Sequence, residues 1–160
     1  MPLNQALKGK EYEPVTFEVT AEHVTRFAEA IDEGRAIFRE PGAAAEAGYP
    51  GQVAPPTFVT AMQIMASGQV VLDPELGLDY SRVVHGEQSY EWHRPAVVGD
   101  VLAAVPRIAD LYAKGSNEFL VIESDITDAA GETVVVGRTT LLSRGTARER
   151  GSGAGSRGDG

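Results

Sequence analysis

Four long runs of alternating apolar and polar residues fill the chain from residue 82 to residue 142. The runs are RVVHGEQSYEWH, DVLAAVPRIADLYA, NEFLVIESDIT and ETVVVGRTTLL, and the segments between them are turn-like: RPAVVG, KGS and DAAG. Alternation places successive side chains on opposite faces of a strand. The pattern therefore predicts four long strands joined by short turns into an antiparallel meander, with Pro106 indicating an edge or a bulge in the second strand.

The segment before these runs predicts a short strand and two helices. Alternating apolar residues indicate a strand within 10–20. Thr20 is a candidate N-cap for a helix over 21–31, where apolar residues recur at helical spacing. Residues 56–67 are apolar on nearly every side, which is typical of a buried helix, and Gly68 is expected to end it.

This order of elements predicts an α+β fold in which a long helix lies on an antiparallel sheet. A length of 160 residues suits one domain, which we place over 1–143. Residues 144–160 are rich in Gly, Ser and Arg, and we expect them to form a disordered tail. A single sheet of this kind leaves an edge strand that must be covered or paired, so we expect a dimer formed through sheet edges.

Composition excludes several classes of function. The net charge is −9 and no cluster of Lys or Arg is present, which argues against nucleic acid as a partner. No apolar run is long enough to span a membrane, and no secretory leader is visible. The absence of cysteine excludes disulfides and thiolate metal sites, and we expect a cytoplasmic protein.

Four stretches carry a resemblance to a known family: FAEAI (27–31), AAAEAGYPGQVAPPTFV (43–59), GLDYSRVVHGEQSYEWHRPAVVGDVL (77–102) and TTLLSRG (139–145). They resemble the MaoC-like (3R)-hydroxyacyl-thioester dehydratases and hydratases. Among these, the likeness is greatest to the non-catalytic (HadA-like) subunits of heterodimeric (3R)-hydroxyacyl-ACP dehydratases and to related bacterial proteins. The resemblance implies a single hot-dog fold, in which a curved antiparallel sheet wraps a long central helix.

The resemblance also implies where a catalytic dyad would lie. Active members carry A-I-G-D-x-N-P-I-H after the first helix, and its Asp and His transfer the protons of hydration. This chain reads AIDEGRAIF over 30–38, with Asp32 at the Gly position, Glu33 at the Asp position and Phe38 at the His position. Phe38 cannot carry a proton, and Glu33 reaches about 1.3–1.5 Å farther than Asp. We expect Arg35 to hold Glu33 as an ion pair.

The start of the predicted buried helix is a candidate substrate-binding segment. A thioester carbonyl needs N–H donors where enolate charge develops, and a helix N-terminus can supply them. Pro55 and Pro56 remove two donors, which leaves the N–H groups of Thr57 and Phe58. Pro56, Thr57, Phe58 and Met62 are the candidate substrate-binding residues, and the flexible Met62 suits the wall of an acyl channel. Alternatively, the prolines only shape the helix start and Met62 only packs in the core.

The run HGEQSYEWH offers a second candidate site. Strand alternation predicts that His85, Glu87, Ser89, Glu91 and His93 share one face. His85 with Glu87 is an alternative acid–base dyad; a polar sheet face or part of a subunit contact are the other interpretations. Next neighbours on one face lie about 6.6–6.8 Å apart, so we expect no metal site.

Two arginines are candidates for contacts with the phosphates of CoA or of a phosphopantetheine arm. These are Arg82 and Arg94. The alternative for each is solvation or an ion pair with a nearby carboxylate.

These observations predict a subunit of a (3R)-hydroxyacyl-thioester dehydratase or enoyl hydratase in fatty-acid metabolism. The resemblance implies that a second hot-dog subunit supplies the dyad, that acyl-ACP or acyl-CoA is the substrate, and that no cofactor takes part. One alternative is an active homodimeric hydratase or thioesterase that uses Glu33, or His85 and Glu87. Another is a non-catalytic module that binds or scaffolds acyl thioesters.

Overall fold

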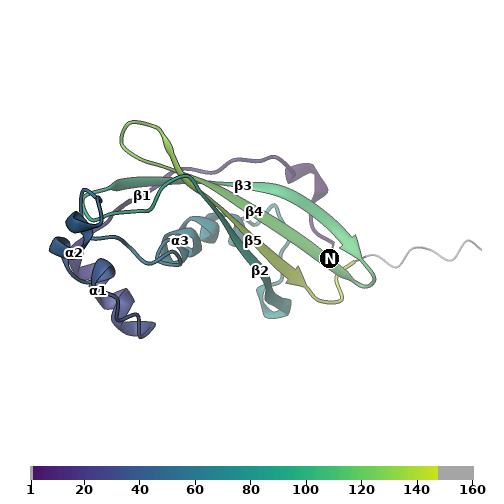
Figure 1. The fold of residues 1–160 in the computed structure, drawn as a ribbon. Helices are drawn as coiled ribbons and strands as arrows, with labels where there is room; N and C mark the ends of the chain where they lie inside the picture. Colours follow the sequence, from purple (N-terminus) through teal and green to yellow (C-terminus); the bar gives the residue numbers. More distant parts are fainter. Residues whose placement is uncertain (1, 148–160) are drawn as a thin grey trace, which may run out of the picture.

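A curved antiparallel sheet of five strands bends over one central helix in the computed structural model, which describes residues 2–147 (Figure 1). The strands are β1 (Val15–Glu18), β2 (Val83–Trp92), β3 (Val101–Lys114), β4 (Asn117–Thr127) and β5 (Thr133–Ser143). The helices are α1 (Ala21–Ala30), α2 (Pro41–Glu46) and the central α3 (Thr60–Val71), with single turns η1 (Gln5–Leu7), η2 (Ala36–Phe38) and η3 (Tyr80–Arg82). The α+β hot-dog prediction is confirmed.

The predicted four-strand meander is wrong in one connection. The strand order is β1-β3-β4-β5-β2, so β3, β4 and β5 form a meander but β2 pairs with β5 across the sheet. Alternation identifies a strand but contains no information about its neighbour. The turn-like segment after β2 carries the chain around the end of the sheet instead of into a hairpin.

The central helix lies four residues later than predicted. Residues 56–59 form turns, in which the Phe58 N–H donates to the Pro55 carbonyl at 2.9 Å, and α3 proper begins at Thr60. Gly68 does not end α3, which continues to Val71. Pro74 is a physical reason for the observed end, because the residue before a proline avoids the helical conformation.

The central helix is also not buried on every side. Met62, Ala66 and Val70 face the sheet and are buried, whereas Ile64 and Met65 are exposed. The helix α3 therefore has two apolar surfaces. One packs against the sheet, and the other is exposed to solvent in the single chain.

Shorter elements complete the domain. The first strand is confined to β1, although an isolated bridge between Glu11 and Arg107 extends the pairing. Thr20 caps α1 as predicted, because its Oγ1 accepts a hydrogen bond from the His23 N–H at 3.2 Å. Beyond β5, Thr146 is buried and Ala147 donates to the Ser116 carbonyl at 3.1 Å; the rest of the predicted tail, 148–160, lies outside the described residues.

The core lies between the central helix and the concave face of the sheet. One cluster packs Met62 and Ala66 of α3 against Leu102 and Ile126, and a second surrounds Val70 at the other end of the helix. A third, smaller cluster gathers around Phe38 beside α1 and α2. Within residues 2–147, no helix is both long and apolar enough to cross a bilayer.

Candidate functional site

A pocket of about 370 Å³ opens beside η2, at the end of the sheet where the chain enters α3. Its lining is mostly apolar, and its volume lies within the range typical of small-molecule sites. The lining residues are Ile37, Phe38, Tyr49, Val53, Ala54, Pro56, Trp92, His93, Arg94 and Pro95. The structure thus brings together the residue at the predicted His position and the segment that leads into the central helix.

Phe38 closes one wall of this pocket. Its side chain is 8% exposed and packs with Ala44 and Val53. The turn that carries it is anchored by Gln52, whose Nε2 donates to the Phe38 carbonyl at 2.8 Å and to Thr25 Oγ1 at 3.1 Å. An aromatic ring therefore stands where the resemblance implies a proton-transferring imidazole.

Glu33 is held by Arg35, as predicted. The Arg35 Nε lies 2.9 Å from Glu33 Oε1, a terminal nitrogen lies 2.6 Å from Oε2, and the Arg35 backbone N–H donates to Oε1 at 3.0 Å. These hydrogen bonds lower the pKa of Glu33 from its ordinary value of 4.5 to about 2. The Arg35 guanidinium also lies 4.9 Å from the centre of the Phe38 ring, within the range of a cation–π contact.

The backbone at the end of α1 supports the alignment that places Glu33 at the Asp position. Asp32 has a positive φ of 55°, the left-handed conformation in which glycine is favoured. Its N–H donates to the Glu29 carbonyl at 3.1 Å, and the Glu33 N–H donates to the Ala28 carbonyl at 2.8 Å, which together form a Schellman motif. The Gly of the family pattern therefore coincides with a position that requires a left-handed residue.

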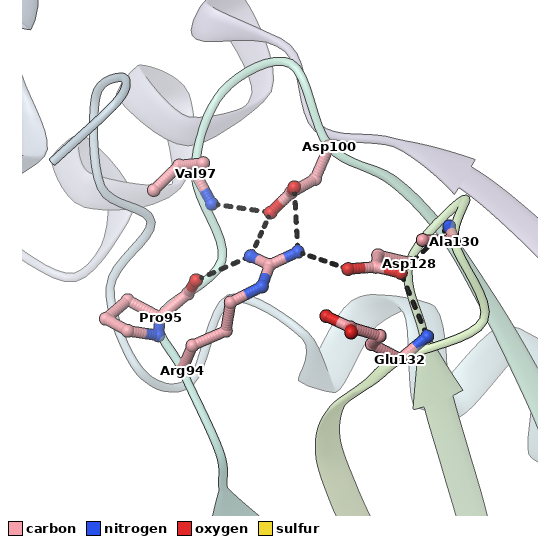
Figure 2. A network of polar contacts seen from close by, with 7 residues as sticks. All are labelled: Arg94, Pro95, Val97, Asp100, Asp128, Ala130 and Glu132. Carbon is pink, nitrogen blue, oxygen red and sulfur yellow. Dashed lines mark hydrogen bonds and ion pairs between the residues drawn. The ribbon is translucent and has the colours of Figure 1, made fainter.

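Arg94 is engaged by carboxylates, so its guanidinium does not point to a phosphate site. One terminal nitrogen lies 2.9 Å from Asp100 Oδ2, and the other lies 3.1 Å from both Asp100 Oδ1 and Asp128 Oδ2 (Figure 2). These bonds raise the pKa of Arg94. The backbone N–H of Glu132, followed by Arg94, lowers the pKa of Asp128. The network ties the loop after β2 to the turn between β4 and β5.

The same network shapes the pocket wall. Arg94 also donates to the carbonyl of Pro95 at 3.0 Å, and Asp100 accepts from the Val97 N–H at 2.9 Å. Arg94 and Pro95 both line the pocket. The ion pairs and hydrogen bonds of Arg94 and Asp100 therefore hold the backbone of one pocket wall in place.

The predicted substrate-binding residues divide into two groups. Pro56 lines the pocket, whereas Thr57 is exposed outside its lining. Phe58 and Met62 belong to the main core cluster between α3 and the sheet. The Phe58 N–H, one of two donors expected at the helix entrance, is already bonded to the Pro55 carbonyl.

His85 and Glu87 do not share a face, so that part of the strand interpretation is wrong. In the β2–β5 ladder His85 pairs with Leu141 and Glu87 pairs with Thr140, with a bulge at Gly86 between them. Because successive residues of β5 point to opposite faces, their partners do too.

A series of side-chain hydrogen bonds connects the inner face of β2 to the central helix. His85 Nε2 lies 3.2 Å from Gln88 Oε1, and Gln88 Nε2 donates to Gln63 Oε1 at 2.7 Å. Thr60 and Tyr90 are hydrogen-bonded through their hydroxyls. Among residues 2–147, no group of three or more potential metal-ligating side chains converges on a point where an ion could bind.

The sequence did not identify several residues as part of this pocket. Tyr49, Trp92 and His93 line the pocket, and His93 is half-exposed at its edge with Nε2 3.7 Å from Glu91 Oε1. The signal that could have identified Trp92 and His93 was the run EWHRP, which lies at the end of β2 where the chain leaves the sheet. A strand end next to a helix entrance is a common place for a binding site, because loop side chains converge there.

Comparison with known proteins places the chain in a family. The model of the FAS1-like, dehydratase domain region matches residues 6–136. A UPF0336 protein of Saccharopolyspora erythraea is 45% identical over 150 residues, which cover 93% of this chain and 96% of that protein.

Solved structures agree with this placement. The HadBC (3R-hydroxyacyl-ACP dehydratase) complex of Mycobacterium tuberculosis contains a chain with a TM-score of 0.77 and 28% identity, covering 85% of this chain and 96% of that one. A MaoC-like dehydratase gives a TM-score of 0.81 and 26% identity, covering 88% of this chain and 43% of that one. The chain therefore belongs to the FAS1-like dehydratase-domain family and has the hot-dog fold of the MaoC-like dehydratases.

Proposed function

We propose that this chain is the subunit without a catalytic dyad in a hot-dog (3R)-hydroxyacyl-thioester dehydratase, acting on acyl-ACP or acyl-CoA in fatty-acid metabolism. In such a reaction a base removes a proton from C2, an acid protonates the C3 hydroxyl, and water leaves to give the trans-2-enoyl thioester. Addition of water to the enoyl thioester is the reverse. Proton transfer alone balances the reaction, so no redox cofactor is required.

The proposal rests on Phe38 in the pocket wall and on the nearby Glu33, which the family resemblance aligns with the His and the Asp of the dyad. Phe38 occupies the His position and contributes a hydrocarbon ring to the wall. Glu33 occupies the Asp position, but Arg35 binds its carboxylate at two points and lowers its pKa to about 2. A carboxylate with so low a pKa is a weak base at neutral pH. We therefore assign proton transfer to a partner subunit.

The pocket itself supports a role in holding the acyl group. Ile37, Val53 and Trp92 give it apolar walls suited to a hydrocarbon chain. Arg94 supports one wall through its two carboxylate partners and so has no free charge to offer a substrate. In this proposal, the chain supplies part of the acyl groove and the partner supplies the reacting groups.

Two features support a second hot-dog subunit as the partner. The similar Mycobacterium tuberculosis chain belongs to a complex of two differently named subunits, HadBC. In this chain, Ile64, Met65 and Leu72 of α3 and its C-cap expose apolar surface that a partner would cover. The active homodimer that uses His85 with Glu87 has less support, because the bulge at Gly86 separates these side chains.

The proposal is tested by co-expressing the chain with a candidate MaoC-like chain from the same organism. We expect the two to co-purify, and the complex to hydrate crotonyl-CoA while the lone chain does not. Failure to co-purify, together with activity in the lone chain, would support the homodimeric enzyme. Co-purification without activity on any hydroxyacyl or enoyl thioester would support the scaffolding module.

The contribution to the acyl groove is tested within the same complex. Ile37→Trp fills part of the pocket and should lower activity on long enoyl thioesters more than on crotonyl-CoA. Ile31→Trp is the matched control, because Ile31 is exposed outside the pocket lining. Equal effects of the two variants on long and short substrates would argue that the acyl chain binds elsewhere.

A further inference from the structure

The strand β2 ends the sheet with a long unpaired edge. It pairs with β5 on one side and stands last in the strand order, so within residues 2–147 its other side has no neighbouring strand. At the opposite end of the sheet, β1 is only four residues long. A long edge strand presents unpaired N–H and C=O groups that can pair with another chain. The free edge of β2 is therefore the stronger template for strand pairing.

Apolar surface on the central helix accompanies this edge. A hydrogen bond between the hydroxyls of Thr60 and Tyr90, and one donated by Gln88 to Gln63, hold α3 against the inner side of β2. On the side of α3 turned away from the core, Ile64 is 67% exposed and Met65 is 50% exposed. A subunit that extends the sheet from β2 would bring its own body against these side chains, burying them.

The outer face of β2 carries an acidic row. Glu87, Ser89 and Glu91 alternate along the strand after the bulge and are all exposed. The strand contains no Lys or Arg. Arg138 of β5 pairs directly with Ser89, but its guanidinium donates to Glu123, 3.0 Å from the Arg138 Nε.

One further titratable group faces the row. His93 follows the strand with Nε2 3.7 Å from Glu91 Oε1, and it offsets charge only when protonated. The row therefore presents two acidic side chains, Glu87 and Glu91, to an incoming strand.

Antiparallel pairing of two copies would bring these carboxylates opposite or diagonal to one another in each register that aligns the two rows. Residues directly opposite must share a face, so row positions meet row positions. If Glu87 faces Glu87 or Glu91 of the other copy, like charges are directly opposite. If Glu87 of one copy faces Ser89 of the other, the Glu87 side chains of the two copies are diagonal neighbours. If Glu91 of one copy faces Ser89 of the other, the two Glu91 side chains are diagonal neighbours. Directly opposite and diagonal side chains both interact, and like charges there destabilise the pair.

We propose that Glu87 and Glu91 form a charge code that selects the partner of this edge. The code weakens pairing with a second copy of the chain and favours a hot-dog subunit whose facing edge strand carries Lys or Arg in the same row. This inference takes one element from the proposed function: that the partner is a hot-dog subunit. The mechanism needs no catalytic group, because the discrimination lies in the electrostatics of the strand ladder.

The code can be tested with the chain and its own charge-reversed variant, Glu87→Lys/Glu91→Lys. Fluorescently labelled wild-type chain is titrated with unlabelled wild type or with the unlabelled variant, and binding is followed by anisotropy. We expect the mixed pair to bind at least about tenfold more tightly than either chain binds itself in about 50 mM salt. The advantage should shrink in about 500 mM salt, where charges on the surface are screened.

Two controls keep the result interpretable. Glu29→Lys/Glu46→Lys makes the same charge change at exposed helix positions away from the edge and should give no preferential mixed pair. Glu87→Gln/Glu91→Gln should strengthen self-association without favouring the mixture, and circular dichroism of every variant verifies folding. The proposal would be overturned if the mixed pair bound no more tightly than each chain binds itself. It would also be overturned if the helix control formed an equally tight mixed pair with the wild type, or if no mixture associated at all.

The readout is separate from the enzymatic proposal. Association of the chain with its own variant involves no substrate and no catalytic subunit. Loss of the charge effect would leave activity of a co-purified complex untouched, and an inactive complex would leave the charge effect measurable.

Discussion

Arg35 binds both oxygens of the Glu33 carboxylate: its Nε lies 2.9 Å from Oε1, and a terminal nitrogen lies 2.6 Å from Oε2. The pair lies directly beside Phe38, whose ring the same guanidinium covers. A hydrated carboxylate could act as a base, but this one is bound at both oxygens. The aromatic ring of Phe38 and the bound carboxylate of Glu33 are thus two parts of one local arrangement.

This arrangement predicts a pH dependence. The pKa of Glu33 is lowered to about 2 in the folded chain from an ordinary value of 4.5, so its ion pair stabilises the fold above pH 4.5 and is lost as the pH falls toward 2. In Arg35→Gln, the pKa of Glu33 should rise toward 4.5, and the free energy of unfolding should depend less steeply on pH in this window. NMR titration of the Glu33 carboxyl measures the first effect and urea denaturation the second.

The control for this prediction is Arg26→Gln, which removes an exposed arginine 3.5 Å from Glu22. It should leave the Glu33 titration unchanged. An unaltered pKa of Glu33 in Arg35→Gln would mean that Arg35 is not the cause of the shift.

Arg94 predicts a second effect, on stability. Arg94→Lys keeps the charge but cannot bind Asp100 at two points and Asp128 at the same time. We expect the free energy of unfolding to fall by about 1–3 kcal/mol, as for lost hydrogen bonds to charged groups. Urea denaturation measures this, with the exposed Arg26→Lys as a control that should change stability by less than about 0.5 kcal/mol. Equal stability of the two variants would show that the network is dispensable.

Gly137 predicts a third effect, through its contact with the central helix. A Cβ at Gly137 would lie 2.4 Å from Gln63 Oε1, at the end of a flexible side chain that would have to move aside. Because this oxygen accepts a hydrogen bond from Gln88, Gly137→Ala should cost about 0.5–1.5 kcal/mol of unfolding free energy. The cost should be smaller in a Gln63→Ala background, which a double-mutant cycle measures. Gly34→Ala, where a Cβ meets nothing within 4 Å, is the control. Additive effects of the two substitutions would contradict the contact.

The left-handed backbone at Asp32 predicts a fourth effect. Asp32→Gly should be tolerated within about 0.5 kcal/mol, because released strain offsets the greater freedom of glycine in the unfolded chain. Asp32→Val should lower the free energy of unfolding by about 1–2 kcal/mol, because a β-branched residue strongly disfavours positive φ. Thermal or urea unfolding of both variants tests this. A valine variant as stable as the glycine variant would contradict the assigned backbone.

Local patterns were sufficient for some elements of this fold. Alternation located β3, β4 and β5, and the Thr20 cap located the start of α1, because each depends on neighbouring residues. The pairing of β2 with β5 joins residues about fifty positions apart and leaves no mark in local periodicity. The start of α3 was misplaced because Pro55 and Pro56 suit a turn as well as a first helical turn.

The candidate site was partly visible in the sequence. Matching AIDEGRAIF to the family pattern identified Glu33 and Phe38 as candidates, and the expected ion pair between Arg35 and Glu33 is present. Gly86 in the sequence indicates a bulge, since glycine within a strand often marks one. Uninterrupted alternation wrongly predicts that His85 lies on the same face as Glu87. Pocket residues such as His93 come together only through the fold.

The hydration of crotonyl-CoA, measured for the lone chain and for its complex with a MaoC-like partner, tests the central claim most directly. We predict that the lone chain is inactive, that Phe38→His alone does not restore activity, and that the complex is active and keeps its rate within about twofold when Glu33→Gln is introduced into this chain. Loss of the partner's Asp or His should abolish activity. Hydration by the lone wild-type chain at roughly tens per second, abolished by Glu33→Gln, His85→Ala or His93→Ala, would contradict the account.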